Sequence, residues 1–580
     1  MSVTRRRPVE HDAAPRPHVR SWRRLEPALA VVAPCALLLL LLRPMLTTHS
    51  AFSTDWPVHL WLLRHQGEAI LHDLHPSFFV HSDDGVFYPH FAFYGGTIYT
   101  LGGPLVALLG DQGRNGYVLE WGLLIAMAYG GWCWLGRLAG LGRWERQAPA
   151  AVFVTAPYFV GLLYTRGAWP EVAALTSIPL LLAAIVAVLR DGRVRLGSGC
   201  ALAGATIVFT GSHGQTLLWT TTLAVVLVPI VLVADRRVRE RVLSRVGLQL
   251  LGVIVPALLV NAWFLVPGLA YASRTFIASA SAYVVWERTI SHTRALLPGP
   301  FFTLRPTTSR DLGVTLPVLA MAWAAVLGIV GRRDAWARLT ALLALPTTVL
   351  VVLIVHGSPL THLPKPYLLI QYTYRLENYI LLAVVGGVLV GLVIARGLGP
   401  GGRRAAWVSL GLVIAVAVVE AGAQEGTRPG GGAYSDYWSP QPTGLGNYAS
   451  SLGHEFTSSQ RLRVTFPARA VHRDRVTIVA HAAPGQLVDT NLVTMPALLR
   501  VRGASVAGYR ASGEGEGIRL RTVLRIAPGA SPGAARVTVE ARTSPAVLVG
   551  RILSLLGLVG LLANVLVRWR GRGGPASPRS

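Results

Sequence analysis

The chain has 580 residues, of which 52% are hydrophobic and only 14% are charged, with a mean hydropathy of +0.47. This balance lies outside the range of ordinary soluble domains and indicates a protein that uses the lipid bilayer as its solvent. The formal net charge is +26, yet most arginines lie in short clusters between apolar runs. That is the positive-inside pattern of membrane proteins, so we expect no nucleic-acid partner. The three cysteines form no CxxC pair and argue against a disulfide framework or a zinc ribbon.

The N-terminal residues 1–26 are polar and basic, and an apolar run from Pro27 to Leu42 follows them. A cleaved signal peptide would carry a small-residue cleavage site after such a run, and none follows at the expected distance. We therefore predict an uncleaved signal anchor, with residues 1–26 as a cytoplasmic tail.

Further apolar segments are each about long enough to span a bilayer. Together with the first run they predict about twelve transmembrane helices, and they lie near residues 117–136, 148–164, 170–189, 197–212, 215–234, 247–271, 312–330, 337–355, 377–395, 406–422 and 545–567. Alternate connections between them are rich in arginine, which assigns those connections to the cytoplasm. The apolar run from Tyr88 to Leu109 would break this alternation if it spanned, so we predict a re-entrant or interfacial helix there.

The long connections fall on the opposite face, and the two longest are residues 44–116 and 423–544. The second alternates apolar and polar residues, which predicts β-strands at 461–466, 475–480, 498–501, 518–526 and 535–541. We therefore expect an all-α polytopic membrane domain over 27–422 and a small extracytoplasmic β-sandwich-like domain over 423–544. A final transmembrane helix at 545–568 and a cytoplasmic tail at 569–580 complete the predicted organisation.

The first outer loop contains a predicted amphipathic helix that begins at Asp55 and lies on the membrane surface. Trp56, Leu60 and Leu63 recur at helical spacing, while Asp55 and His59 fall on another face. Asp55 has two interpretations. An Asp with Pro in the first turn is a good helix N-cap. An acid at the boundary between lipid and water can also accept a proton from a substrate hydroxyl.

Seven of the sixteen histidines lie in the same loop, together with Asp73, Asp83 and Asp84. Histidine and carboxylate ligands suit zinc or manganese, so a metal site involving Asp83 and Asp84 is one hypothesis. The spacing matches no compact signature such as HExxH, however, and solvated loop histidines are the other hypothesis.

Three further groups of polar residues lie on the outer face of predicted spans. Arg166 and Glu171 begin one span, His213 lies in a short turn, and Arg375 and Glu377 begin another span. Charges at membrane depth are costly and are usually paired or functional. Arg166 would pair with Glu171, and Arg375 with Glu377, as interfacial anchors. Alternatively, the two arginines receive a lipid-linked phosphate.

Taken in order, these motifs resemble bacterial multi-pass proteins of the GT-C glycosyltransferase superfamily. The resemblance extends to membrane proteins labelled as related to 6-pyruvoyl-tetrahydropterin synthase and to YfhO-type proteins. The matching stretches are STDWPVHLW (53–61), GVFYPHFAFYGGTIY (85–99), YTRGAWPEVAAL (164–175), the His213 turn, NAWFLVPGL (261–269) and IQYTYRLEN (370–378). The stretch PGQLVDTNLVTMPALLRVRG (484–503) resembles the β-domain ending of YfhO-type proteins. No pterin pocket or zinc-histidine triad supports the pterin label.

The resemblance implies an inverting transfer of a sugar from a polyprenyl-phosphate donor to an envelope glycan, lipid or protein. The reaction would take place on the extracytoplasmic face of the bacterial plasma membrane. The resemblance casts Asp55 as the general base, and it casts Arg375 and Arg166 as groups that neutralise the leaving lipid phosphate. In many members a divalent cation, Mg or Mn, shares that role. The expected substrate-binding residues are His59, Tyr88, Tyr94, Arg166, Glu171, His213, Arg375 and Glu377.

Two other functions compete with the enzyme. A transporter or flippase for a lipid-linked intermediate would share the spans and the intramembrane charges, but it should show inverted repeats and broken helices. A non-catalytic assembly protein would use its β-domain to bind envelope polymer. The large first outer loop with its acidic residue favours the enzyme.

Overall fold

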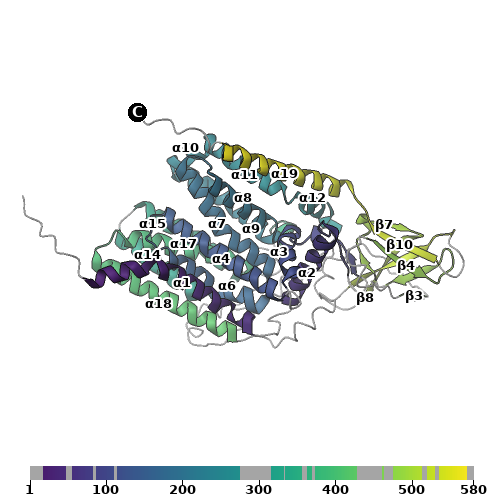
Figure 1. Ribbon diagram of the computed structural model, residues 1–580, viewed down its shortest axis with the longest axis horizontal. Helices are drawn as coiled ribbons and strands as arrows, with labels where there is room; N and C mark the ends of the chain where they lie inside the picture. The colour runs from purple at the N-terminus through teal and green to yellow at the C-terminus, as the bar shows by residue number, and fades with distance from the viewer. Residues whose placement is uncertain are drawn as a thin grey trace, which may run out of the picture.

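The computed structural model describes residues 17–47, 55–81, 86–109, 114–274, 315–331, 334–355, 362–368, 373–426, 460–462, 475–490, 492–512, 519–529 and 535–570. Most of its helices lie side by side in one bundle, and the β-sheets lie beyond one end of that bundle (Figure 1). The chain is thus mostly helical, with small sheets that precede the last helix.

Helices account for most of the described chain. The first half contains α1 (Pro17–Thr47), α2 (Asp55–Asp73), α3 (Gly96–Leu108), α4 (Arg114–Leu138), α5 (Gln147–Thr155), α6 (Pro157–Gly161), the π-helical turn η3 (Leu162–Arg166), α7 (Trp169–Asp191), α8 (Leu196–Thr210), α9 (Gly214–Ala234), α10 (Arg236–Val242), α11 (Arg245–Leu259) and α12 (Ala262–Tyr271). The second half contains α14 (Thr315–Gly331), α15 (Asp334–Val355), α16 (Lys365–Leu368), the 3-10 turn η9 (Thr373–Leu376), α17 (Glu377–Ala395), α18 (Pro400–Gly426) and α19 (Pro545–Arg570).

Six of the described helices, α1, α4, α7, α9, α17 and α19, are long and apolar enough to cross a membrane. Two bent pairs raise the number to eight if each pair forms one span: α5 with the segment that follows it, and α10 with α11. These helices suit a multi-pass membrane protein, while the count of about twelve spans stays a prediction. α3 has 13 residues and is shorter than a span.

Helix α2 begins at Asp55 as predicted, and beyond the exposed Asp55 most of its polar face is closed to solvent. His59, His65 and Gln66 are all buried. α3 packs against this helix so closely that a Cβ atom on Gly67 would lie 2.1 Å from the carbonyl oxygen of Gly103. The sequence pattern predicts one apolar and one polar face, and tertiary packing covers most of both.

The C-terminal sheets arise from strands β3 (Gln460–Leu462), β4 (Arg475–Ala480), β5 (Leu487–Thr490), β6 (Val493–Thr494), β7 (Leu499–Arg502), β8 (Ala504–Ser512), β9 (Arg519–Ile526) and β10 (Ala535–Ala541). One sheet has the antiparallel order β4-β10-β7. The other has the order β3-β5-β9-β8, antiparallel except for the β3–β5 pair. Strands at 475–480 and 535–541 match the prediction residue for residue, whereas β5 and β8 were not predicted.

A third sheet joins the segment between α2 and α3 to this C-terminal region. Strands β1 (Val80–His81) and β2 (Val86–Tyr88) form an antiparallel pair, and β2 pairs in parallel with β6. In that register Val86 lies opposite Val493 and Phe87 opposite Thr494. The C-terminal strands are therefore hydrogen-bonded to the loop that begins with α2.

The last helix is held against the bundle by polar contacts with backbone groups. Ser554 Oγ accepts a hydrogen bond from the amide of Trp263 at 2.8 Å and donates to the carbonyl oxygen of Val260 at 2.9 Å. Further toward the C-terminal end of the helix, Asn564 Nδ2 donates to the carbonyl oxygen of Gly252 at 2.9 Å. α19 thus packs along α11 and α12 at the edge of the bundle (Figure 1).

Candidate functional site

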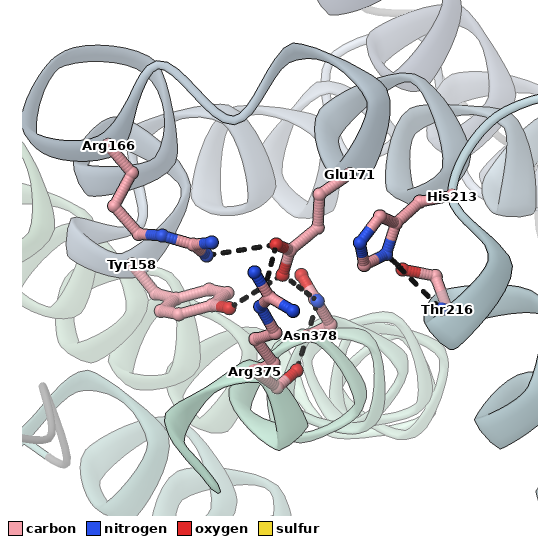
Figure 2. Close-up of polar contacts among 7 residues, drawn as sticks. All are labelled: Tyr158, Arg166, Glu171, His213, Thr216, Arg375 and Asn378. Atoms are coloured by element: carbon pink, nitrogen blue, oxygen red, sulfur yellow. Dashed lines mark hydrogen bonds and ion pairs between the residues drawn. The ribbon is translucent and has the colours of Figure 1, made fainter. Parts of the chain in front are cut away.

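Glu171 lies at the centre of the most connected polar group in the described helices (Figure 2). Its side chain, in the first turn of α7, is 2% exposed. Arg166 Nη1 lies 2.9 Å from Glu171 Oε2, and Arg375 Nε lies 3.6 Å from the same oxygen. Two guanidinium groups from distant parts of the chain therefore converge on one carboxylate.

The other oxygen of Glu171 is also occupied. Asn378 Nδ2 donates to Oε1 at 2.7 Å, and the hydroxyl of Tyr158 donates to it at 3.3 Å. Asn378 Nδ2 also donates to the carbonyl oxygen of Arg375 at 3.0 Å, which ties the 3-10 turn to α17. We call Tyr158, Arg166, Glu171, Arg375 and Asn378 the Glu171 cluster. A buried carboxylate is stable only when it is paired and hydrogen-bonded, and this cluster supplies both kinds of partner to Glu171.

Local backbone geometry explains how these groups meet. Gly167 has a φ of +65°, in the left-handed region that glycine adopts at little cost, and it ends the π-helical turn just after Arg166. The chain then reverses, so that α7 begins at Trp169 and presents Glu171 back to Arg166. On the other side, Arg375 and Asn378 are three residues apart and share one face of a helical turn.

His213 stands next to the Glu171 cluster as the N-cap residue of α9. Its Nδ1 accepts a hydrogen bond from the amide of Thr216 at 3.3 Å, and Thr216 Oγ1 lies 2.9 Å from the same nitrogen. Figure 2 shows the ring beside Glu171, with Thr216 on the far side of the ring. His213, which was predicted as a binding residue, therefore also caps the N-terminus of α9.

Asp55 is the solvent-accessible carboxylate of this region. Protein atoms nevertheless surround it closely enough that burial raises its pKa above the ordinary value for Asp. The positive charges of Arg166 and Arg375 act in the opposite direction, and the negative charge of Glu171 reinforces the rise. Asp55 therefore lies within electrostatic reach of both arginines, as the sequence-based hypothesis requires.

An aromatic group connects Asp55's helix to His213. His59 Nδ1 lies 2.7 Å from the hydroxyl of Tyr99, and the His59 ring stacks on Tyr94 at a centroid distance of 6.0 Å. Tyr94 in turn meets His213 edge-on at 6.0 Å. Burial lowers the pKa of His59 to about 3, so that this ring is neutral at physiological pH. Of the predicted binding residues, His59, Tyr94, Arg166, Glu171, His213 and Arg375 therefore come together.

Two predicted site residues take other places. Tyr88 is buried in β2, where its ring packs near Phe93 at a centroid distance of 6.0 Å. Of the two ion pairs considered as interfacial anchors, Arg166 with Glu171 is formed, whereas Arg375 pairs with Glu171 in place of Glu377. Glu377 is buried at the start of α17, and no ion pair joins it to another described residue. Neighbours in sequence at a helix start point in different directions, so proximity along the chain misled the prediction.

The described residues provide no set of ligands for the predicted metal site. Asp83 and Asp84 lie outside the described residues, and within the described ranges no group of three His, Cys, Asp or Glu side chains could hold a metal ion. A divalent cation beside Glu171 would face two guanidinium groups and compete with the donors on both carboxylate oxygens. The Glu171 cluster therefore does not fit Mg or Mn, and we derive no chemical step through a metal.

No protein-family model, curated protein or solved structure matches this chain. The site therefore has to be interpreted from its own residues. Four of them, Tyr99, Tyr158, Thr216 and Asn378, were not predicted as site residues. Asn378 had a usable signal, because it follows Arg375 by three residues at the start of an apolar helix. Tyr158 and Thr216 lie in apolar runs and gave none.

Proposed function

We propose that this protein is a membrane glycosyltransferase that transfers a sugar from a polyprenyl-phosphate donor to an envelope acceptor on the extracytoplasmic face. The observation that carries the proposal is the place of Asp55, a solvent-accessible carboxylate within electrostatic reach of two partly buried arginines. An acid beside cations is the arrangement that a base-assisted displacement of an anionic leaving group needs.

The arginines supply the charge for the leaving group. Arg166, Arg375 and Glu171 together carry one more positive than negative charge, and Glu171 fixes the direction of both guanidinium groups. Arg375 has the longer contact with the carboxylate, 3.6 Å against 2.9 Å for Arg166, so we assign it the main contact with the phosphate. Arg–phosphate hydrogen bonds are among the stronger polar contacts in proteins, because both partners are charged.

The proposed step is a single inverting displacement. The acceptor hydroxyl gives its proton to Asp55 as its oxygen bonds to the anomeric carbon of the sugar. The bond between that carbon and the phosphate oxygen breaks, and the polyprenyl phosphate leaves as an anion. Arg375 and Arg166 stabilise the charge that develops on this phosphate. Glu171 is a positioning residue in this scheme, since it acts through the arginines.

The raised pKa of Asp55 sets the acid limit of the reaction. A general base works only when deprotonated, and burial shifts the deprotonation of Asp55 to higher pH. Transfer should therefore fall as the pH decreases through a pKa that lies above the ordinary Asp value. A pH–rate profile for transfer measures this limit, and an acid limb at the ordinary value would contradict it.

The decisive experiment compares Asp55→Asn with Asp55→Ala in purified protein supplied with labelled polyprenyl-phosphate sugar. Asn caps a helix nearly as well as Asp but cannot accept the proton, so transfer should fall about a hundredfold or more with thermal stability kept. Ala should also lower the stability by about 1 kcal/mol. An active Asn variant beside a destabilised Ala variant would mean that Asp55 is only a cap.

A matched control is available at Asp235, the N-cap of α10. Its side chain accepts hydrogen bonds from the amides of Arg237 and Val238, and it is exposed at the opposite end of α9 from His213. Asp235→Asn and Asp235→Ala should change stability in the way that a pure cap does and leave transfer unchanged.

Broken helices favour a second candidate, a transporter of lipid-linked anions. The helical segment before Arg166 bends by 46° between α5 and the residues that follow. Discontinuous membrane helices beside charged groups are a feature of transporters. Protein reconstituted in liposomes with labelled donor separates the two functions. Movement of the donor between leaflets without sugar transfer or hydrolysis would favour the transporter.

A further inference from the structure

The protonation of the His213 ring follows from its hydrogen bonds. The backbone amide of Thr216 donates to Nδ1 at 3.3 Å. A backbone amide can only donate, so Nδ1 is the acceptor and carries no proton. The neutral ring therefore holds its proton on Nε2, on the side opposite to Thr216.

The surroundings keep this ring neutral. Burial and the nearby charges of Arg375 and Arg166 lower the pKa of His213 to about 3, with Glu171 acting in the opposite direction. The positive end of the α9 dipole also disfavours a second positive charge at this place. At physiological pH His213 is thus a neutral N–H donor of fixed orientation.

The Nε2 atom lies on the side of the Glu171 cluster. Figure 2 shows the second ring nitrogen directed toward Glu171 and Asn378. His213 is 5% exposed, and within the described ranges no protein group accepts a hydrogen bond from Nε2. Nε2 is not one of the fully enclosed unpaired atoms, so it keeps some accessible surface, and a donor that has no acceptor among the described residues beside two arginines is suited to an anionic ligand.

We propose that His213 is a ligand-binding residue, donating a hydrogen bond from Nε2 to an oxygen of the lipid-linked phosphate beside Arg375 and Arg166. The assignment rests on the proposed function, which supplies a phosphate ligand at this place. A neutral donor contacts the phosphate without adding positive charge next to two guanidinium groups. The Thr216 amide holds the ring in this orientation before the ligand arrives.

Two substitutions separate this role from simple helix capping. His213→Asn places an acceptor near the position of Nδ1 and is a good N-cap, but it removes the distal donor. His213→Gln keeps a donor near the position of Nε2 and caps the helix less well. The binding of a short-chain polyprenyl phosphate to the full-length protein in detergent is measured for each variant, with the corresponding polyprenyl alcohol as the neutral control.

We expect the Asn variant to bind the phosphate about 10–100-fold more weakly at unchanged thermal stability, the usual loss for one hydrogen bond to a charged group. The Gln variant should keep most of the affinity although its unfolding temperature falls. An Asn variant that binds like the wild type, or that loses affinity for the alcohol equally, would overturn the assignment, as would a wild type that binds no phosphate. Tight phosphate binding that depends on His213 in a protein without transfer activity would instead remove the proposed function and leave the assignment standing.

Discussion

Two pairs of helices in this protein have the same hydropathy and opposite surroundings. The most apolar windows of α7 and α17 have mean hydropathies of 2.6 and 2.4, and those of α9 and α19 have 2.4 and 2.3. Yet 67% and 78% of the window residues are buried in the first pair, against 6% and 17% in the second. Hydropathy therefore identifies a membrane helix without telling which of its neighbours are protein.

The polar residues at the site distinguish the protein-surrounded helices α7 and α17 from the exposed helices α9 and α19, which hydropathy does not. Glu171 and Asn378, which bind each other, lie on the buried pair, and Arg166 and Arg375 immediately precede it. The exposed pair carries apolar side chains such as Val225 and Leu555 on its surface. Charges are tolerated at membrane depth where protein partners surround them, and apolar surface suits contact with lipid.

The largest effect that tests this comparison should come from Glu171→Ala. The substitution removes the buried carboxylate on which the largely enclosed side chains of Arg166 and Arg375 converge, which should destabilise the protein by about 3–5 kcal/mol. Thermal unfolding in detergent measures the change. The control is Glu240→Ala, which breaks an exposed pair with Arg236 on α10 and should cost about 0.2–1 kcal/mol. Equal losses in the two variants would break the comparison.

A second test uses two asparagines, one on each kind of helix. Asn378 donates to the buried carboxylate of Glu171, whereas Asn564 on α19 donates to the neutral carbonyl group of Gly252. Asn378→Ala should cost about 1.5–3 kcal/mol and Asn564→Ala about 0.5–1.5 kcal/mol, because bonds to charged groups are the stronger ones. The same unfolding assay ranks the two, and a reversed order would show that α19 contributes more than its exposure suggests.

The smallest difference should appear between two valines. Val384 in α17 is fully buried, and Val225 in α9 is 67% exposed. Val384→Ala leaves a cavity among protein side chains and should cost about 1–2 kcal/mol. Val225→Ala changes only a surface contact and should stay within about 0.5 kcal/mol. A large loss at Val225 would indicate a protein partner, in place of lipid, against α9.

Local elements of the fold could be predicted from the sequence. The start of α2 at Asp55 followed from helical spacing and from Pro57 in the first turn, and β4 and β10 followed from strict alternation. β5 and β8 could not be found in this way. β5 is short, with three consecutive buried residues, and β8 has an irregular register between Val506 and Gly508, so neither alternates cleanly.

The candidate site could be predicted only in part. The sequence indicated Asp55, Arg166, Glu171, His213 and Arg375 as unusual polar residues near the ends of spans, and the structure brings them together. Their partners could not be deduced, because Glu171 and Asn378 are separated by 207 positions and a single sequence carries no record of such a contact. Arg375 was paired with its neighbour for the same reason. The packing of α3 against α2 determines which side of α2 contacts protein. That packing cannot be deduced from the residues of α2 alone.

The parallel pairing of β2 with β6 has a consequence for the order of biosynthesis. Its two strands lie about 400 residues apart, so at the usual elongation rate of roughly 5–20 residues per second the partner of β2 emerges about 20–80 s later. The segment that follows Asp55's helix must wait through this interval with an open strand edge, while the helices that carry the Glu171 cluster are being synthesised. Ribosomes that stop before Val493 would therefore release chains with a complete cluster and an unfinished first outer loop. In such chains β2 presents unpaired backbone N–H and C=O groups along one edge. A chaperone or protease could bind these groups in an incomplete chain but not in a finished one.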